Sequence, residues 1–436
     1  MGDFFEDRLT RPRVKTPPPG PNALRVLARD GRSVSQGGLR PFRFVMRDGL
    51  GCWARDVDDN VFLDFTSGIG VLATGHCHPR VVEAIRSQAG RFLHISSAYH
   101  TYDVMVRLAE RIGQSVAVTQ PARVFFANSG TEAIEGAVKL ARWYTRRPYV
   151  LSFFGAFHGR TLAALSVSGL NSEQRRGLGP LLPGVFHLPY PDSDRGVTSQ
   201  DMLARAEELF ERVVPPDEVA AVVVEAIQGG AGPMSIPDDG FLPLLRKLAD
   251  RHGFLLVVDE VYTGVGRTGT MWAHQHWSAR PDVVCFAKSI ASGMPLGGFV
   301  AGAGLMEWPR GSHNSTFGGN PVACAAAETT LDVVQDGLID NAIRQGGTLL
   351  DELTALARKH PLLISRVRGK GLMLYVELRS AEIAQRTLEI AFTNGLLLLA
   401  AGRQGLRLAP PLIVAEHESH VAMEILAQTL EAVTAG

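Results

Sequence analysis

The 436-residue sequence has few cysteines, no excess of either charge and no long apolar run. Its four cysteines form no CxxC pair and have no ligand-like spacing with histidine, so we expect reduced thiols and no metal site. The 44 basic and 44 acidic residues cancel, which leaves no general field to attract nucleic acid or an anionic membrane. No apolar run reaches the ~18 residues of a membrane span, and the charged N-terminus lacks the apolar core of a signal peptide. We therefore expect a cytoplasmic protein.

From about residue 80 onward, short apolar runs alternate with amphipathic stretches, as in RVFFANSG followed by TEAIEGAVKLARWYT. Such βα units predict an α/β fold with a mostly parallel sheet and helices on both faces. Further strand candidates are near-continuous apolar runs, as expected for strands buried on both faces. They span residues 149–154, 254–261, 282–287 and 297–302.

The chain divides into four expected segments. Residues 1–40, which include Pro17, Pro18, Pro19 and Pro21, lack sustained periodicity and suggest an arm of the kind that often lies across a partner subunit. Residues 41–79 alternate around turn residues and predict a small antiparallel sheet. We expect residues 80–320 to form the large domain. Residues 321–436, which begin with an Ala-rich helix, should form a smaller α+β domain that the small sheet joins.

Ligands collect at the carboxyl ends of strands in a parallel sheet, so the residues that follow each strand carry most information. Ser129, Gly130 and Thr131 follow one strand and open a helix, where free N–H groups can bind a phosphate. Helix capping by Ser129 or Thr131 is the commoner alternative. Asp259 and Glu260 follow another strand, and a buried carboxylate there either caps a loop or meets a cation.

Lysine is scarce, with six residues among the 44 basic ones. Only Lys288 lies between an apolar strand and a Gly-rich turn, where a desolvated amine becomes a nucleophile for carbonyls. A snorkelling structural lysine is the alternative. Phe157 and His158 follow a further strand and offer a flat face for stacking, although a core aromatic is the commoner case. A phosphate cradle, a buried carboxylate, a strand-end lysine and a stacking aromatic together predict a pyridoxal phosphate site.

Seven stretches then carry a family resemblance: NSGTEAIEGAVKLAR, GAFHGRT, EAIQGG, VVDEVYTGVGRTG, FAKSIASGMPLGG, STFGGNPVACAAA and GLRLAPPL. In this order they resemble the motifs of the class III aminotransferases of the ornithine, acetylornithine and 4-aminobutyrate type. The match runs from about residue 40 to the C-terminus. PPPGPNALRVLARD and WPRGSHNSTFGGN further resemble a branch close to the 4-aminobutyrate aminotransferases, in which some members are racemases or epimerases.

The resemblance implies the fold of type I pyridoxal phosphate transferases, with a seven-stranded sheet plus a small α+β domain. It also implies a homodimer, or a dimer of dimers, with shared active sites. Lys288 would form the Schiff base and carry a proton, while Asp259 would bind the pyridine nitrogen. The other cofactor contacts would be Ser129, Gly130 and Thr131 at the phosphate, Phe157, His158 and Val261 at the ring faces, Gln228, Tyr262, and Thr316 from the neighbouring subunit.

The resemblance also implies substrate contacts. Arg407 would grip the α-carboxylate, a task that suits a bidentate guanidinium. Arg160 would hold the second carboxylate of glutamate or 2-oxoglutarate, and Glu225 would cover Arg407 when an ω-amino donor is bound. An ordinary ion pair is the alternative for Arg160 and Glu225. Gly68 to Gly70 match the substrate-lining loop.

Three departures from the family matter. This chain has Ala226 where many relatives have Pro, Gly230 where they have Glu or Asp, and Tyr262 where they have Gln. An Asp at position 230 resembles the second proton base of the racemases, so its absence favours transamination. We therefore expect an aminotransferase that moves an amino group from an amino acid, such as 4-aminobutyrate or ornithine, to 2-oxoglutarate. A racemase or epimerase on the same scaffold is the alternative, and a cofactor-binding regulatory module is a third hypothesis.

Overall fold

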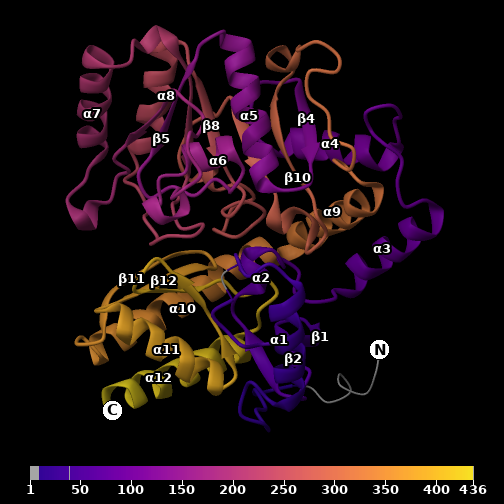
Figure 1. Ribbon diagram of the computed structural model, residues 1–436, viewed down its shortest axis with the longest axis vertical. Coiled ribbons are helices and arrows are strands. Elements are labelled where there is room, and N and C mark those ends of the chain that lie inside the picture. Colours follow the sequence, from indigo (N-terminus) through magenta and orange to yellow (C-terminus); the bar gives the residue numbers. More distant parts are fainter. Residues whose placement is uncertain (1–8, 39, 436) are drawn as a thin grey trace. The chain divides into compact units, whose positions relative to one another are not determined.

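The chain forms two compact units. The computed structural model describes residues 9–38 and 40–435. Arg80–Asp336 form one unit, while Met1–Pro79 and Gly337–Gly436 together form the other. The second unit therefore carries the colours of both chain ends, indigo and yellow, in Figure 1. Residues 1–8 of the expected arm, and Leu39, lie outside the described residues.

A seven-stranded sheet forms the centre of the Arg80–Asp336 unit, with strand order β4-β10-β9-β8-β7-β5-β6. The neighbours among β5 to β9 pair in parallel, and β10 runs antiparallel to both β4 and β9. This confirms the mostly parallel seven-stranded sheet. The strands are β4 (Ala122–Ala127), β5 (Tyr149–Phe153), β6 (Val185–Leu188), β7 (Val219–Glu225), β8 (Leu255–Asp259), β9 (Val283–Phe286) and β10 (Gly297–Gly302).

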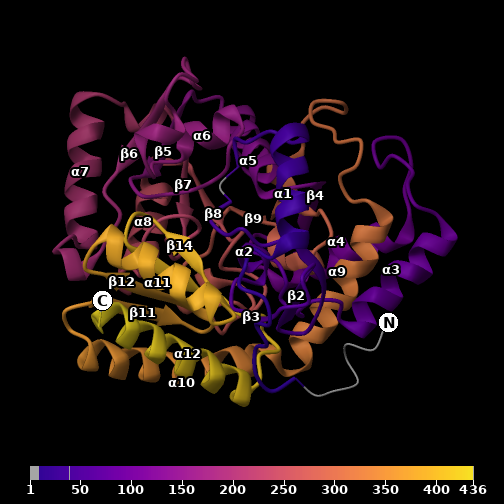
Figure 2. The same ribbon diagram turned by 60° about the horizontal axis from the view of Figure 1, so that its bottom comes forward.

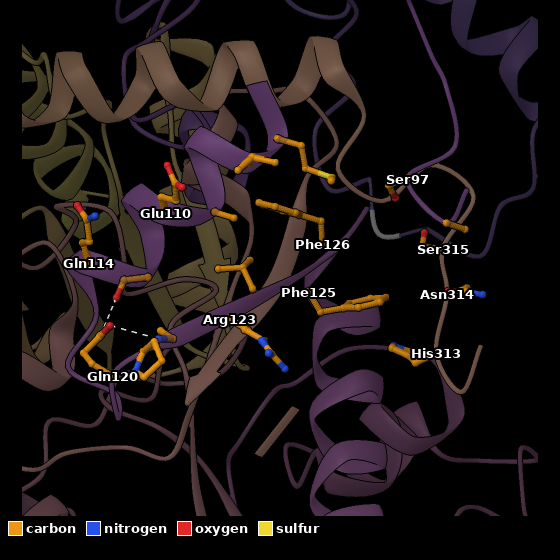
Figure 3. A pocket seen from close by; sticks show the side chains of 18 residues that line it. Ser97, Glu110, Gln114, Gln120, Arg123, Phe125, Phe126, His313, Asn314 and Ser315 are labelled. Carbon is orange, nitrogen blue, oxygen red and sulfur yellow. Dashed lines mark hydrogen bonds between the residues drawn. The ribbon is translucent and has the colours of Figure 1, made fainter. Parts of the chain in front are cut away.

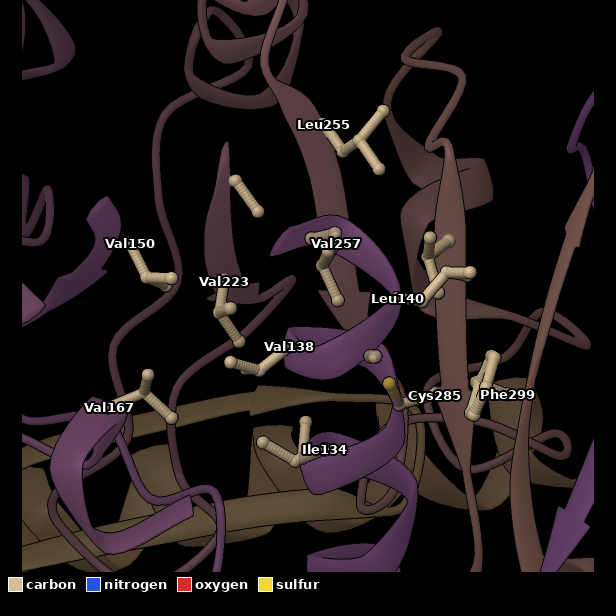
Figure 4. Packing of buried hydrophobic residues seen from close by; sticks show 14 of the residues in the cluster. Ile134, Val138, Leu140, Val150, Val167, Val223, Leu255, Val257, Cys285 and Phe299 are labelled. Atoms are coloured by element: carbon tan, nitrogen blue, oxygen red, sulfur yellow. The ribbon is translucent and has the colours of Figure 1, made fainter. Parts of the chain in front are cut away.

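Both faces of this sheet are buried because its central strands β7 and β8 are apolar up to their last residues, Glu225 and Asp259. On one face, Ile134 and Val138 of helix α5 (Gly130–Thr145) pack with Val223, Val257 and other strand residues in one cluster (Figure 4). Successive strand residues point to opposite faces. The intervening Val222, Val224, Leu256 and Val258 are equally buried, so the other face is covered as well.

Seven α-helices surround the sheet or extend from it: α3 (Pro79–Arg91), α4 (Asp103–Ser115), α5, α6 (Leu162–Val167), α7 (Ser199–Arg212), α8 (Phe241–His252) and α9 (Pro321–Val333). Helix α9 belongs to the same unit as the seven-stranded sheet, whereas a domain boundary was expected before it, after residue 320. Salt bridges from Arg107 to Glu328 and from Arg111 to Asp332 tie α9 to α4. The division instead falls at Gly337, inside the π-helical turn Val334–Leu338.

Two small sheets form the centre of the other unit. One has the order β1-β2-β3-β13 and is antiparallel except for the β3 and β13 pair; the other, β11-β12-β15-β14, is antiparallel throughout. Helix α10 packs along β11, and α12 packs against both α10 and α11 (Figure 2). Its strands are β1 (Met46–Leu50), β2 (Trp53–Asp56), β3 (Val61–Asp64), β11 (Ile364–Lys370), β12 (Met373–Leu378), β13 (Leu396–Leu397), β14 (Leu399–Ala401) and β15 (Gly405–Leu408). Its helices are α1 (Pro21–Ser33), α2 (Ser67–Gly70), α10 (Ile339–Lys359), α11 (Ala381–Thr393) and α12 (Glu416–Ala435).

The expected N-terminal arm contains the helix α1, which a distant side chain caps. Both oxygens of Asp58 accept hydrogen bonds from the first turn, from the N–H groups of Asn22 and Ala23, each at 2.8 Å. Within the described residues, no helix is long and apolar enough to cross a membrane.

Candidate functional site

Five strand ends bring the expected cofactor residues to one edge of the seven-stranded sheet. Strands β5, β7, β8 and β9 are parallel, and β4 runs in the same direction because both β4 and β9 are antiparallel to β10. Their carboxyl ends therefore lie at the same edge. The residues at or just after these ends are Ser129 to Thr131, Phe157 to Arg160, Glu225, Gln228, Asp259 to Tyr262, and Lys288.

Asp259 and His158 form a buried pair at this edge. His158 Nδ1 lies 2.7 Å from Asp259 Oδ2, and the other oxygen of Asp259 accepts the N–H of Val261 at 2.9 Å. Burial opposes a charged imidazole, but the hydrogen bond to Asp259 and the negative charges of Asp259 and Glu225 outweigh it and raise the pKa of His158. Asp259 thus has a protein partner that can carry positive charge, in His158, which was expected only at a ring face.

Glu260 caps a loop, which was the other role considered for a carboxylate at this strand end. Its side chain is buried and accepts the N–H groups of Ala273 and His274, at 3.0 and 2.7 Å. The Thr263 hydroxyl also donates to it, and His274 Nδ1 lies 2.9 Å away. The sequence did not identify the backbone partners in this loop because they lie 13 and 14 residues further along the chain.

Lys288 begins the short 3₁₀ helix Lys288–Ala291, directly after the residue that follows β9. Its φ of +46° lies in the left-handed region, which L-residues rarely adopt. The ammonium nitrogen lies 5.0 Å from the centroid of the Tyr262 ring, within the range of a cation–π contact. Lys288 is half-buried beside Tyr262, whose exposed fraction is 4%.

The turn before α5 has the expected geometry of a helix N-terminus. Ser129 is the N-cap and its hydroxyl accepts the N–H of Glu132 at 3.4 Å, so the capping role is present. The Thr131 hydroxyl accepts the N–H groups of Arg160 and Thr161 at 3.3 and 3.2 Å. Thr131 therefore ties the first turn of α5 to the loop that follows β5.

Glu225 supports the residue expected to cover one ring face. Its carboxylate accepts the N–H of Phe157 at 3.1 Å and that of Gly230 at 3.3 Å. Burial, together with the charge of Asp259, raises the pKa of Glu225 to about 7, although His158 and the two N–H groups oppose the shift. Arg160 is exposed, with its guanidinium 5.6 Å from the Phe157 ring centroid. Among the described residues, Arg160 and Glu225 form no ion pair with each other.

Of the two remaining expected cofactor contacts, Gln228 is anchored by a hydrogen bond and Thr316 is exposed. The Gln228 amide donates to the Phe154 carbonyl at 3.0 Å, which anchors it to the end of β5. Thr316 is exposed, and its neighbour Ser315 accepts a hydrogen bond from the Asn128 side chain at 3.2 Å. The Thr316 loop is therefore tied to the turn that carries Ser129.

A hollow of about 610 Å³ runs beside the edge strand β4, next to this loop. Figure 3 shows Phe125 and Phe126 of β4 and His313 to Ser315 lining it, with Glu110 and Gln114 of α4. It has no lining residue among the expected cofactor contacts. The hollow is therefore not part of the expected cofactor site.

Arg407 and the Gly68 to Gly70 loop belong to the other unit. Arg407 lies in β15, is 6% exposed and stands opposite Tyr375 of β12. Four consecutive residues, from Ser67 to Gly70, have φ between +41° and +71°. The Ser67 hydroxyl donates to the carbonyl of Ala409 at 2.6 Å, so this strained turn is anchored two residues beyond Arg407.

Comparison with known proteins identifies the family. An alanine/serine racemase of Pyrococcus horikoshii is 36% identical over 96% of this chain and 93% of its own. A 4-aminobutyrate aminotransferase of Escherichia coli is 37% identical over 87% of this chain and 92% of its own. A solved ornithine aminotransferase of Toxoplasma gondii, described with pyridoxal phosphate at its active site, is 30% identical with a TM-score of 0.85 over 94% of each chain. Residues 34–430 match the family model for class-III aminotransferases. The chain therefore belongs to the class III aminotransferases, a pyridoxal phosphate-dependent family of enzymes.

Proposed function

We propose that this enzyme transfers an amino group from an amino acid to 2-oxoglutarate, with Lys288 as the lysine that binds the cofactor. The observation that carries the proposal is the position of Lys288 after β9, at the same sheet edge as the buried Asp259 and His158 pair. No other lysine in the part of the chain that the structure describes follows a strand of this sheet.

The residues at this edge fit pyridoxal phosphate. The 16-residue helix α5 offers its N-terminus to the phosphate. A Cβ on Gly130 would lie 2.7 Å from Val261 Cγ1, so only glycine leaves the backbone and Val261 this close. His158 Nε2 is buried and has no hydrogen-bond partner among the described residues, which leaves one polar atom of the pair open to a bound group.

When bound, the cofactor supplies an electron sink for the substrate's α-carbon. Asp259, hydrogen-bonded to His158, would hold a proton on the ring nitrogen. Lys288 Nζ would take the proton from the α-carbon and return it at the cofactor carbon that receives the amino group. Phe157 and Val261 would orient the ring and exclude water from its two faces.

For the substrates, we propose that Arg407 binds the α-carboxylate and Arg160 the second carboxylate of glutamate or 2-oxoglutarate. The exposure of Arg160 suits a residue that meets a ligand from solution. Glu225 would compensate Arg407 when an ω-amino donor is bound. The names of the relatives favour 4-aminobutyrate or ornithine as the donor.

A second candidate function is amino-acid racemisation, which the 36% identity to an alanine/serine racemase favours. Glycine at position 230 disfavours racemisation. Glycine has no side chain that could act as the additional base expected at position 230. A Cβ there would lie 2.9 Å from Glu225 Oε1, so an aspartate would also require Glu225 to move.

We also propose that the enzyme is a homodimer in which Thr316 contacts the cofactor phosphate of the partner. The exposure of Thr316, and the hollow beside the unpaired edge of β4, support an interface with a second copy at this place.

One paired assay tests the proposed reaction. The purified enzyme is given a panel of amino acids with and without 2-oxoglutarate, and both glutamate formation and chiral inversion of the donor are measured. Glutamate that forms only with the acceptor supports transamination and names the donor. Inversion without an acceptor would replace the proposal by racemisation.

A further inference from the structure

Tyr262 occupies a position where the family resemblance implies glutamine, and its ring faces the amine of Lys288. The nitrogen lies 5.0 Å from the ring centroid, inside the ~6 Å within which a cation is attracted to an aromatic face. Both residues lie at the carboxyl ends of adjacent strands, β8 and β9. A glutamine side chain could not present such a face.

The turn that carries Tyr262 is held from both sides. Before it, the Glu260 carboxylate accepts the hydrogen bonds from Thr263, Ala273 and His274 described above. After it, the N–H of Gly264 donates to the Glu260 carbonyl at 2.9 Å. A Cβ on Gly264 would lie 2.9 Å from the Trp272 ring, so this part of the loop is also closely packed.

Lys288 is equally constrained at its backbone. It begins a short 3₁₀ helix with a left-handed φ of +46°, and Ser289, Ile290 and Ala291 after it are buried. The direction of its Cα–Cβ bond is therefore set at the end of β9. From this start the amine reaches the ring of Tyr262, at 5.0 Å from its centroid.

We propose that Tyr262 is a positioning residue that holds the ammonium form of Lys288 over its ring face. This rests on the proposed role of Lys288 as the cofactor lysine. An amine that leaves the cofactor when substrate binds needs a resting place beside the site. The ring of Tyr262 stabilises the protonated amine there, and so sets how readily Lys288 gives and takes its proton.

The small number of lysines makes a direct test practical. Full-length apoenzyme is labelled with ¹³Cε-lysine, which gives six resonances, and the one that Lys288→Ala removes is assigned to Lys288. Its pH titration is then followed in wild type, Tyr262→Gln and Tyr262→Phe.

Losing the ring face should favour deprotonation of Lys288 by about tenfold in Tyr262→Gln. Tyr262→Phe keeps the face and should titrate like wild type. Tyr144→Gln, which removes a half-exposed tyrosine from α5, is the matched control and should change nothing.

Three results would overturn the proposal. Wild-type titration in Tyr262→Gln would show that the ring does not act on the amine. An equal change in Tyr262→Gln and Tyr262→Phe would assign the effect to the hydroxyl. The third measurement needs no variant: the ring should shift the wild-type Lys288 Cε protons upfield of the other five lysines, and an unshifted signal contradicts the contact. These outcomes are separate from the proposed function, which is tested by the paired assay and by locating the lysine that binds the cofactor.

Discussion

Replacing Gly159 with alanine should disturb the cofactor site through one defined collision. The new Cβ would lie 2.2 Å from Thr131 Oγ1 and 2.6 Å from Thr131 Cβ, whereas ordinary contacts begin near 3.4 Å. Gly159 also has a φ of +140°, which L side chains rarely adopt. Backbone strain of ~1–3 kcal/mol and overpacking of ~1–3 kcal/mol together lower the free energy of unfolding by roughly 2 to 6 kcal/mol.

The loss should extend to the cofactor because Thr131 is the residue that must move. Its hydroxyl would give up the N–H groups of Arg160 and Thr161, and the first turn of α5 would shift with it. Denaturant unfolding of the apoenzyme measures the stability, and fluorescence titration with pyridoxal phosphate measures the affinity. Gly177→Ala is the matched control, since φ there is +74° but nothing lies within 4 Å of the new Cβ. It should cost only about 1 to 2 kcal/mol and leave cofactor affinity unchanged. Equal losses in the two variants would refute the collision with Thr131.

Three further predictions concern buried carboxylates. The pKa of Glu225 is raised to about 7 from 4.5, so between these pH values the folded apoenzyme holds a proton that the unfolded chain releases. The free energy of unfolding of the wild type should therefore fall as the pH rises from about 4.5 through 7, by up to ~3 kcal/mol. Glu225→Gln should flatten that part of the pH profile in urea unfolding, and an unchanged slope would contradict the shift. Glu260→Gln places an amide against four donors and should cost about 3 to 5 kcal/mol by the same measurement, with a wild-type unfolding midpoint as the contrary result. Asp58→Ala removes both acceptors at the start of α1 and should lower stability by about 1 to 2 kcal/mol, while no loss would mean that water caps the helix equally well.

The sequence predicted the central sheet well because its strands are long apolar runs. Residues 297–302 were expected as a strand, and β10 has the same bounds. Strand β6 (Val185–Leu188) was missed because it has four residues, with His187 among them, and none of the expected site residues follows it. Helix α1 was missed for another reason. Its cap is Asp58, more than 30 residues away, and no local pattern reveals such a partner.

The sequence named candidate site residues but not the contacts between them. It did not predict that His158, 101 residues away, pairs with Asp259. It did not foresee that Glu225 supports the Phe157 backbone, or that Thr131 holds the loop after β5. Both contacts join residues from different strands, so they depend on sheet order, which a single sequence does not specify. The domain boundary at residue 320 differed because α9 is bound to α4 by side chains that no periodicity identifies.

The most direct test of the account is to locate the lysine that binds the cofactor. The holoenzyme is reduced with borohydride, which makes the lysine bond to pyridoxal phosphate permanent, and its peptides are mapped by mass spectrometry. We predict a single adduct, on Lys288. An adduct on any of the other five lysines (15, 139, 247, 359 or 370), or none at all, would contradict it.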